Sequence, residues 1–433
     1  MGNRNRLTVL LFSAVLLPAI IAYVVLYREA VSVPYQDDYN AILAFATRYV
    51  QLPTMKAKVL DVATTQTNDY KLAFPHFIIA MEMELTGHLN FEFLVTFGDL
   101  LLLPIAYLLW RTYQTDVGNL NQRLIQFIPI SFLFFSLTYW ESLDWAIAGL
   151  QNISVIFFGF LAIYLLIPKA TVSRPPFLFL GCLSAMLAAF SSANGFLLAP
   201  VGLMILLRRR AMAASLAWCA SFALPVAAYL YHYTPYHISV NRLHTASYIS
   251  KVFYLFAFLG CAIPFRWPAA LLGIVIAAII LLAACSRFDR TNPVAFYFTV
   301  WILGTAFLAA WLRGEIPSRY SIYSILLLVF CYSFLAQYLR GRSIVLNHKR
   351  FYATSLVLAI AFCFLSDLRA YKHLLERREM VLSGMDHYRE SPEFNSPNID
   401  PEMARYDSTE AAFERVTLNK AIQQHIYTLP PTR

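Results

Sequence analysis

The sequence is poor in charge: only 14% of its 433 residues are Asp, Glu, Lys or Arg, whereas 59% are hydrophobic. Soluble domains carry about 25% charged residues. The scarcity of charge therefore excludes an ordinary water-soluble protein and predicts an integral membrane protein. The net charge of +9 does not indicate nucleic-acid binding, because the basic residues lie in short clusters between apolar runs. Cytoplasmic loops of membrane proteins have this distribution.

Several other features are missing. The six cysteines show no Cys-x-x-Cys spacing and lie within or at the ends of apolar segments, so neither a disulfide framework nor a cysteine metal site is predicted. No internal repeat is evident, and no small-x-small cleavage site follows the first apolar run at residues 7–27. That run can cross a hydrocarbon layer of roughly 30 Å, and we expect it to be a retained anchor.

Eleven apolar runs are predicted to cross the membrane as helices, because lipid-exposed backbone must satisfy its hydrogen bonds internally. They lie near residues 7–27, 91–110, 124–140, 151–168, 176–192, 195–207, 213–231, 267–285, 292–311, 320–339 and 351–366. With a cytoplasmic N-terminus, every compact basic cluster between spans falls on the cytoplasmic face, in accord with the positive-inside bias. The expected fold class is an all-α polytopic membrane protein.

Short apolar stretches modify this threading. Residues 72–87 and 251–265 are too short to span and are expected to be interfacial or re-entrant helices. Spans 176–192 and 195–207 are also short, and they are joined by the sequence Ser-Ser-Ala-Asn-Gly. Broken helices at membrane depth usually line a cavity. The threading leaves a long first loop, about residues 28–90, and a polar C-terminal tail outside the cell.

Two adjacent carboxylates, Asp37 and Asp38, open the first loop in the stretch VPYQDDYN. One of them is expected to cap the helix that begins near Tyr39, since Asp is a favoured N-cap residue. The other would be free to act as a general base toward an acceptor hydroxyl. No cofactor is assigned; a divalent metal stays possible, because hard cations take carboxylate ligands, although no firm third ligand is evident.

Arginines and carboxylates also gather near the outer ends of later spans. Arg313 and Arg319 suit bidentate phosphate binding, while snorkelling to lipid headgroups or pairing with Glu315 stays open. Glu141 and Asp144 lie beside two tryptophans, which fits either a substrate site or an interfacial anchor belt.

The histidines match no strong zinc motif. His237, together with His232, His244 and several tyrosines of the outer loop 232–250, is a candidate for flanking a sugar ring. His76 lies on the apolar face of its stretch, so a packed histidine is predicted there rather than a ligand.

These segments together resemble the bacterial GT-C membrane glycosyltransferases, which use polyprenyl-phosphate sugars, and within them an uncharacterised branch. The similarity starts at PYQDDYN and NDYKLAFPHFIIAMEMELTGHLNFEFLVTFGDLLLL and continues in WESLDWAIAGLQN, FSSANGFLLAPVGLMILLRRR and PSRYSIYS. It covers roughly residues 5–340. Where that branch has an acidic residue, a histidine and an arginine, this chain has Asp69, Tyr70 and Lys71, so a histidine relay does not carry over.

The resemblance implies a GT-C-like enzyme of the bacterial inner membrane, with residues 1–340 as catalytic module, 341–366 as last span and 367–433 as extracytoplasmic tail. It would transfer a sugar, with inversion, from a polyprenyl-phosphate donor to a glycan, lipid or protein acceptor on the outer face. Asp37 or Asp38 would be the base, and Arg319, Arg313 and Lys71 would bind the donor phosphate. The expected substrate contacts are Asp69, Tyr70, Glu141, Asp144, His237 and Tyr320.

Other classes of protein stay open. A lipid-linked glycan flippase or transporter would also have many spans, but its charges would lie near the midplane and its halves would often repeat. An O-antigen polymerase or ligase type of enzyme would bind similar lipids, usually through a large outer loop in mid-chain. A catalytically inactive scaffold also fits the sequence.

Overall fold

The computed structural model describes residues 3–113, 118–167, 175–235, 247–312, 316–341, 348–390 and 408–431. These residues are mostly helical, and the two short strands among them, β1 Gln66–Thr67 and β2 Tyr70–Lys71, pair antiparallel. The predicted all-helical architecture is confirmed. Arg313 and His237 lie outside the described residues.

Nine helices in the described part of the chain are long and apolar enough to cross a membrane. They are α1 Asn3–Glu29; α5 Phe91–Leu100 with α6 Leu102–Thr112; α7 Leu120–Phe134 with η2 Leu137–Tyr139 and α8 Trp140–Asp144; α9 Ala146–Leu166; α13 Met212–Ser221 with α14 Ala223–Leu230; α17 Arg266–Cys285; α19 Pro293–Leu312; η4 Ser318–Tyr320 with α20 Ser321–Gly341; and α21 His348–Glu390. Each of the nine corresponds to a predicted span.

Three shorter apolar segments complete the bundle. The predicted spans 176–192 and 195–207 are α11 Pro175–Ser191 and η3 Ala193–Leu197 with α12 Leu198–Arg208. The stretch 251–265, expected to be interfacial or re-entrant, contains most of α16 Tyr248–Leu259, which packs against α17, α19 and α20. These segments are shorter than a full span, so the structure supports nine crossings by length.

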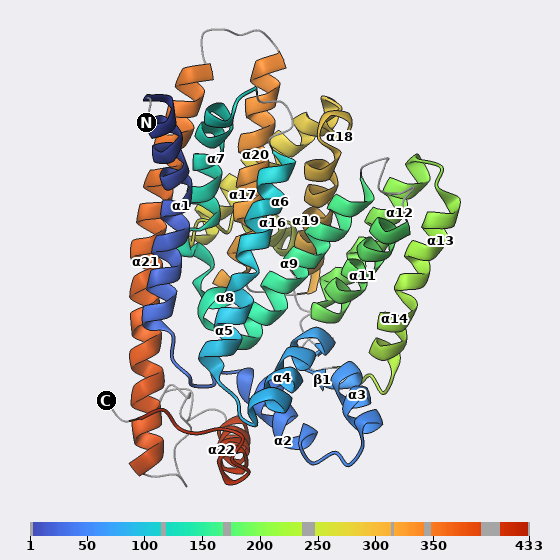
Figure 1. Ribbon diagram of the computed structural model, residues 1–433, viewed down its shortest axis with the longest axis vertical. Helices are drawn as coiled ribbons and strands as arrows, with labels where there is room; N and C mark the ends of the chain where they lie inside the picture. The colour runs from blue at the N-terminus through green and yellow to red at the C-terminus, as the bar shows by residue number, and fades with distance from the viewer. Residues whose placement is uncertain are drawn as a thin grey trace.

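The first long loop folds into a helical layer at one end of the bundle, which we call the loop end (Figure 1). It comprises η1 Tyr39–Ala44, α2 Phe45–Tyr49, α3 Met55–Thr64, the strand pair and α4 Ala73–Thr86. Gly87 ends α4 with a left-handed φ of 76°, a conformation that glycine adopts without strain. The buried His76 stacks on Phe45 with ring centroids 4.3 Å apart, which confirms the predicted packing.

The opposite end of the bundle carries the basic clusters. The N-terminus, the ends of α6 and α12, the short helix α18 Phe288–Thr291 and the start of α21 all lie there (Figure 1). Arg208 at the end of α12 pairs with Asp289 at 2.7 Å. The clusters that fall within the described residues thus share one end, and the side of the membrane that this end faces stays a prediction.

The C-terminal part of the chain packs against the loop end. The predicted last span, 351–366, is only the first part of α21, which continues unbroken to Glu390. After it, α22 Ser408–Gln423 contacts η1 and α2. The Tyr427 hydroxyl donates to the Ser32 carbonyl at 2.7 Å, and the Leu89 N–H donates to the Ile426 carbonyl at 2.7 Å. The tail and the first loop therefore share one hydrophobic core.

Candidate functional site

A cavity of about 380 Å³, which we call the larger cavity, lies where the first loop meets the bundle. Its volume is within the range of small-molecule sites, about 300–1,000 Å³. The lining combines polar and aromatic side chains with an apolar wall from α19. The residues are Asp69, Tyr70, Gln151, Asn152, Ser192, Ala193, Asn194, Tyr229, Tyr233, Pro235, Phe258, Thr305, Leu308, Ala309, Leu312, Tyr320 and Tyr323.

The break between α11 and α12 supplies hydrogen-bonding groups to this cavity. Asn194 donates from Nδ2 to the Tyr323 hydroxyl at 2.8 Å and to Thr305 Oγ1 at 3.4 Å. Its Oδ1 is buried and has no hydrogen-bond partner among the described residues. Gln151 on α9 donates to Ser192 Oγ at 3.2 Å. The prediction that the Ser-Ser-Ala-Asn-Gly break lines a cavity is confirmed.

The strand pair of the first loop contributes Asp69 and Tyr70 to the larger cavity. Asp69 is half-buried and is the one carboxylate among the described lining residues. The Tyr229 hydroxyl donates to the Asp69 carbonyl at 3.0 Å, which fixes the turn against α14. Asn68 donates from Nδ2 to Asp37 Oδ1 at 3.3 Å. Asp37 is therefore held beside the turn that presents Asp69.

Asp38 is buried, and both of its oxygens accept backbone hydrogen bonds. Oδ2 accepts from Tyr35 N and Oδ1 from Ile147 N, each at 3.0 Å. The helix beginning at Tyr39 was predicted, but Asp38 makes no side-chain cap bond to it; it instead bonds the first turn of α9, because its side chain turns inward. Burial raises the pKa of Asp38 to about 7, although the two N–H donors and Arg377 act in the opposite direction.

A buried ion pair joins the tail to the bundle next to Asp38. Arg377 on α21 contacts Asp144 at 3.2 Å, and both side chains are 8% exposed. The Arg377 guanidinium also lies over the Tyr35 ring, 4.2 Å from its centroid. Tyr35 in turn contacts the Trp145 ring edge-on, with centroids 5.5 Å apart.

Arg319 and Glu141 lie in the same neighbourhood. The Arg319 guanidinium is 5.0 Å from the centroid of the Trp145 ring, and its backbone N–H donates to Glu141 Oε2 at 3.1 Å. Tyr35 is within electrostatic range of Arg319, Arg377, Glu141 and Asp38. We call Asp38, Glu141, Asp144, Arg319 and Arg377 the charged cluster.

The structure thus brings together three predicted residues, Asp69, Tyr70 and Tyr320, in the larger cavity and four more, Asp38, Glu141, Asp144 and Arg319, in the charged cluster. Lys71 is separate from both: its ammonium group is buried and donates to the Tyr231 carbonyl. Burial lowers its pKa.

Sequence reasoning missed Arg377, which lies in the polar tail. A signal was present, because α21 buries Leu374, Arg377, Val381, Met385 and Tyr388 along one face at helical spacing. An arginine within an otherwise apolar stripe indicates a buried partner.

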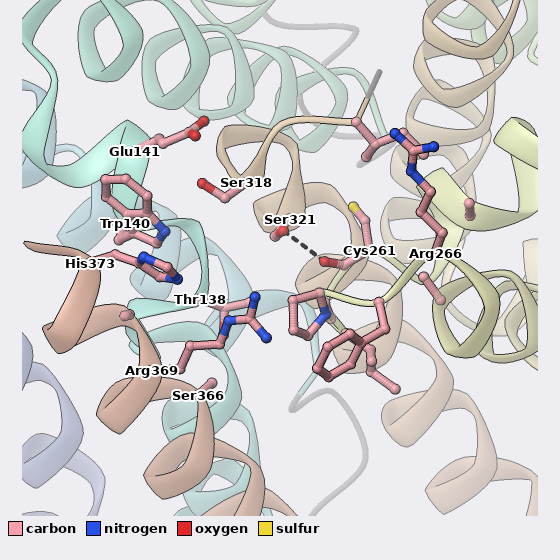
Figure 2. A pocket seen from close by; sticks show the side chains of 18 residues that line it. Thr138, Trp140, Glu141, Cys261, Arg266, Ser318, Ser321, Ser366, Arg369 and His373 are labelled. Carbon is pink, nitrogen blue, oxygen red and sulfur yellow. Dashed lines mark hydrogen bonds between the residues drawn. The ribbon is translucent and has the colours of Figure 1, made fainter. Parts of the chain in front are cut away.

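A second cavity, of about 260 Å³, lies among α8, the α16–α17 turn, η4 and α21 (Figure 2). We call it the smaller cavity. Trp140 stacks on His373 at its edge, with ring centroids 5.5 Å apart, and Glu141 is shared between its wall and the charged cluster.

Among the described residues, no three His, Cys, Asp or Glu side chains gather closely enough to hold a metal ion. Comparison of the chain with protein-family models, with curated proteins and with solved structures found no match.

Proposed function

We propose that the protein transfers a sugar from a polyprenyl-phosphate donor to an acceptor hydroxyl at the loop end, with inversion at the anomeric carbon. The loop end would face outward from a bacterial inner membrane. The observation that carries the proposal is the larger cavity, in which one carboxylate, amide groups and tyrosines adjoin an apolar wall of a membrane-type helix. The resemblance to GT-C glycosyltransferases supports it independently.

The two sides of the larger cavity suit the two parts of such a donor. Asn194, Gln151 and the tyrosine rings offer hydrogen bonds and flat faces to a sugar, as sugar-binding sites require. Leu308 and Leu312 on α19 offer an apolar wall, and Leu312 is 45% exposed at the outer surface of the bundle. An isoprenoid chain would lie along this wall within the bilayer.

Asp69 is the carboxylate that we assign as general base. It would take the proton of the acceptor hydroxyl, whose oxygen attacks the anomeric carbon from the face opposite the phosphate. The bond from that carbon to the phosphate oxygen breaks, and its electron pair leaves with the phosphate. Asp37 is the alternative base, since Asn68 holds it next to the same turn. Asp38 is assigned a positioning role, because its oxygens are occupied by backbone N–H groups.

Arginine would stabilise the charge that grows on the leaving phosphate. Arg319 directly precedes Tyr320, which lines the larger cavity. Arg313 follows Leu312, another lining residue, in the sequence. Removing an electrostatic stabiliser of this kind typically lowers the rate about 100-fold or more.

The test compares Asp69→Asn and Asp37→Asn with Asp61→Asn in membranes supplied with a radiolabelled polyprenyl-phosphate sugar. Loss of the base should lower sugar transfer about 100-fold or more. Asp61 is the matched control, because it pairs with the exposed Arg48 in the same loop and is absent from the described lining of the larger cavity. Full activity in both Asp69→Asn and Asp37→Asn would refute the base assignment; movement of the lipid without sugar release would indicate a transporter.

The orientation is tested by cysteine labelling of intact cells in a background without native cysteines. A membrane-impermeant maleimide should label Gln36→Cys at the loop end and leave Arg210→Cys at the basic end unlabelled. Both positions are exposed, whereas the neighbouring Asp38 is only 1% exposed and would resist labelling from either side. The reverse pattern would place the loop end in the cytoplasm.

A further inference from the structure

The smaller cavity adjoins the larger one through η4. Ser318 lines the smaller cavity, and Tyr320 lines the larger. Figure 2 shows Arg369 and His373 from α21, Arg266 from α17 and Ser318 from η4 around the smaller cavity. Charged and hydroxyl groups from three separate elements therefore line one cavity, with Arg266 on the side opposite Arg369 and His373 (Figure 2).

The two arginines of this cavity are not neutralised by the protein. Neither Arg266 nor Arg369 forms a hydrogen bond or ion pair with any residue that the structure describes, and both are exposed. The nearby acids are engaged elsewhere: Asp367 accepts from a backbone N–H at 2.7 Å, and Glu141 accepts from another at 3.1 Å. The Arg369 guanidinium lies 5.1 Å from the centroid of the Phe265 ring. Two positive, planar donor groups are thus available to an anion.

A buried hydroxyl adds a third donor. Ser318 Oγ is buried and has no hydrogen-bond partner among the described residues. A neighbouring lining hydroxyl, Ser321 Oγ at the start of α20, is satisfied, because it donates to the Cys261 carbonyl at 2.8 Å (Figure 2). An orphaned buried hydroxyl is costly unless something accepts from it. A phosphate oxygen in the cavity would do so.

The surroundings of the cavity are apolar and face outward. Phe265 is 60% exposed and Trp267 is 74% exposed beside Arg266, and Leu365 and Leu368 on α21 are 66% and 56% exposed. Aromatic residues next to arginine are typical of the membrane interface. This arrangement suits an amphiphile whose apolar part stays in the bilayer, and it is a poor fit for a free phosphate ion.

We propose that the smaller cavity binds the phosphate group of an anionic lipid, with Arg369 as charged ligand, Ser318 as hydroxyl donor and Arg266, on the opposite wall, as a second positive charge that attracts the headgroup. The lipid is either a glycerophospholipid of the bilayer or a polyprenyl phosphate, since both present a phosphate beside an apolar chain. The site requires no sugar transfer in the larger cavity, so it stands whatever reaction occurs there.

The test reconstitutes the full chain in phosphatidylcholine nanodiscs with either phosphatidylglycerol or polyprenyl phosphate added, and bound lipid is counted by native mass spectrometry. The double variant Arg266→Gln/Arg369→Gln should lower retention of the preferred anionic lipid about tenfold or more, because one charge-assisted hydrogen bond and a second positive charge of the cavity are lost. Lys372→Gln is the matched control. Lys372 lies one helical turn after Arg369 on α21, its side chain is 75% exposed, and the variant likewise removes a positive charge.

The outcomes separate the possible ligands. Loss confined to phosphatidylglycerol assigns the site to a bilayer phospholipid, and loss confined to polyprenyl phosphate assigns it to the carrier lipid. Arg266→Lys/Arg369→Lys should retain part of the binding, since the charge remains. Equal retention by wild type and the Gln double variant, or equal loss in Lys372→Gln, would overturn the proposal; gel filtration checks that each variant is folded.

Discussion

Breaking the buried pair between Asp144 and Arg377 should strongly destabilise the protein. Both side chains are 8% exposed and their charged atoms are 3.2 Å apart, so removing one partner leaves the other charge buried without compensation. Such losses cost about 3–5 kcal/mol. The destabilisation by Arg377→Met should lie toward the upper end of this range. Arg377→Met also removes the cation–π contact with Tyr35 at 4.2 Å, which contributes about 0.5–2 kcal/mol.

A double-mutant cycle tests this reasoning. Asp144→Asn, Arg377→Met and the double variant are unfolded by SDS in mixed micelles, and tryptophan fluorescence gives the free energy of unfolding. The free energy of unfolding of the double variant should fall by about 2 kcal/mol less than the two single losses added together, because the double variant leaves no unpaired buried charge. Lys372→Met is the control, since the Lys372–Glu376 pair is 75% and 53% exposed and such pairs contribute about 0–1 kcal/mol. If each single variant lost less than about 1 kcal/mol of unfolding free energy, and the two losses simply added in the double variant, a stabilising buried pair would be refuted.

Two further predictions concern protonation and packing. Burial raises the pKa of Asp38 and of Glu82 to about 7, from ordinary values of 3.8 and 4.5; the folded protein therefore holds protons that the unfolded chain has released, and its stability should fall as the pH rises from about 4 through 7. The free energy of unfolding should be lower at pH 8 than at pH 5. The double variant Asp38→Asn/Glu82→Gln should show a smaller difference between the two pH values. An equal difference in wild type and double variant would contradict the assignment of the pH dependence to Asp38 and Glu82. Gly195→Ala should lower the melting temperature, because its new Cβ would lie 2.2 Å from the Ala188 carbonyl oxygen. Gly118→Ala, whose Cβ meets nothing closer than a side-chain atom at 3.6 Å, should be neutral, and equal melting temperatures for the two variants would count against a tight turn at the larger cavity.

The elements that could be predicted from the sequence are those set by local chemistry. Long apolar runs must become helices in a membrane, and nine of them appear as helices of sufficient length. The polar break near Asn194 was recognisable because short helix pairs at membrane depth line cavities. Asp69, Tyr70 and Tyr320 were selected by resemblance, and they meet in the larger cavity.

The remaining features depend on contacts between distant parts of the chain. Asp38 bonds the start of α9 across 109 residues, and no local pattern around Asp38 reveals that partner. Arg377 meets Asp144 only because α21 continues to Glu390. The smaller cavity has Arg266 and Arg369 on opposite walls, supplied by two helices that are far apart in the chain. Sequence periodicity shows which face of a helix is buried, but it does not show which helix covers that face.

The shared core of the first loop and the tail has a consequence for biosynthesis. Tyr39, Ile42 and Phe45 pack in one cluster with Leu418, Ala421 and Tyr427. The ribosome makes the first group long before the second, so a growing chain holds an unfinished apolar core at the loop end until α22 packs against η1 and α2. A chain that stalls or is cut before that point would leave this apolar surface exposed at the loop end.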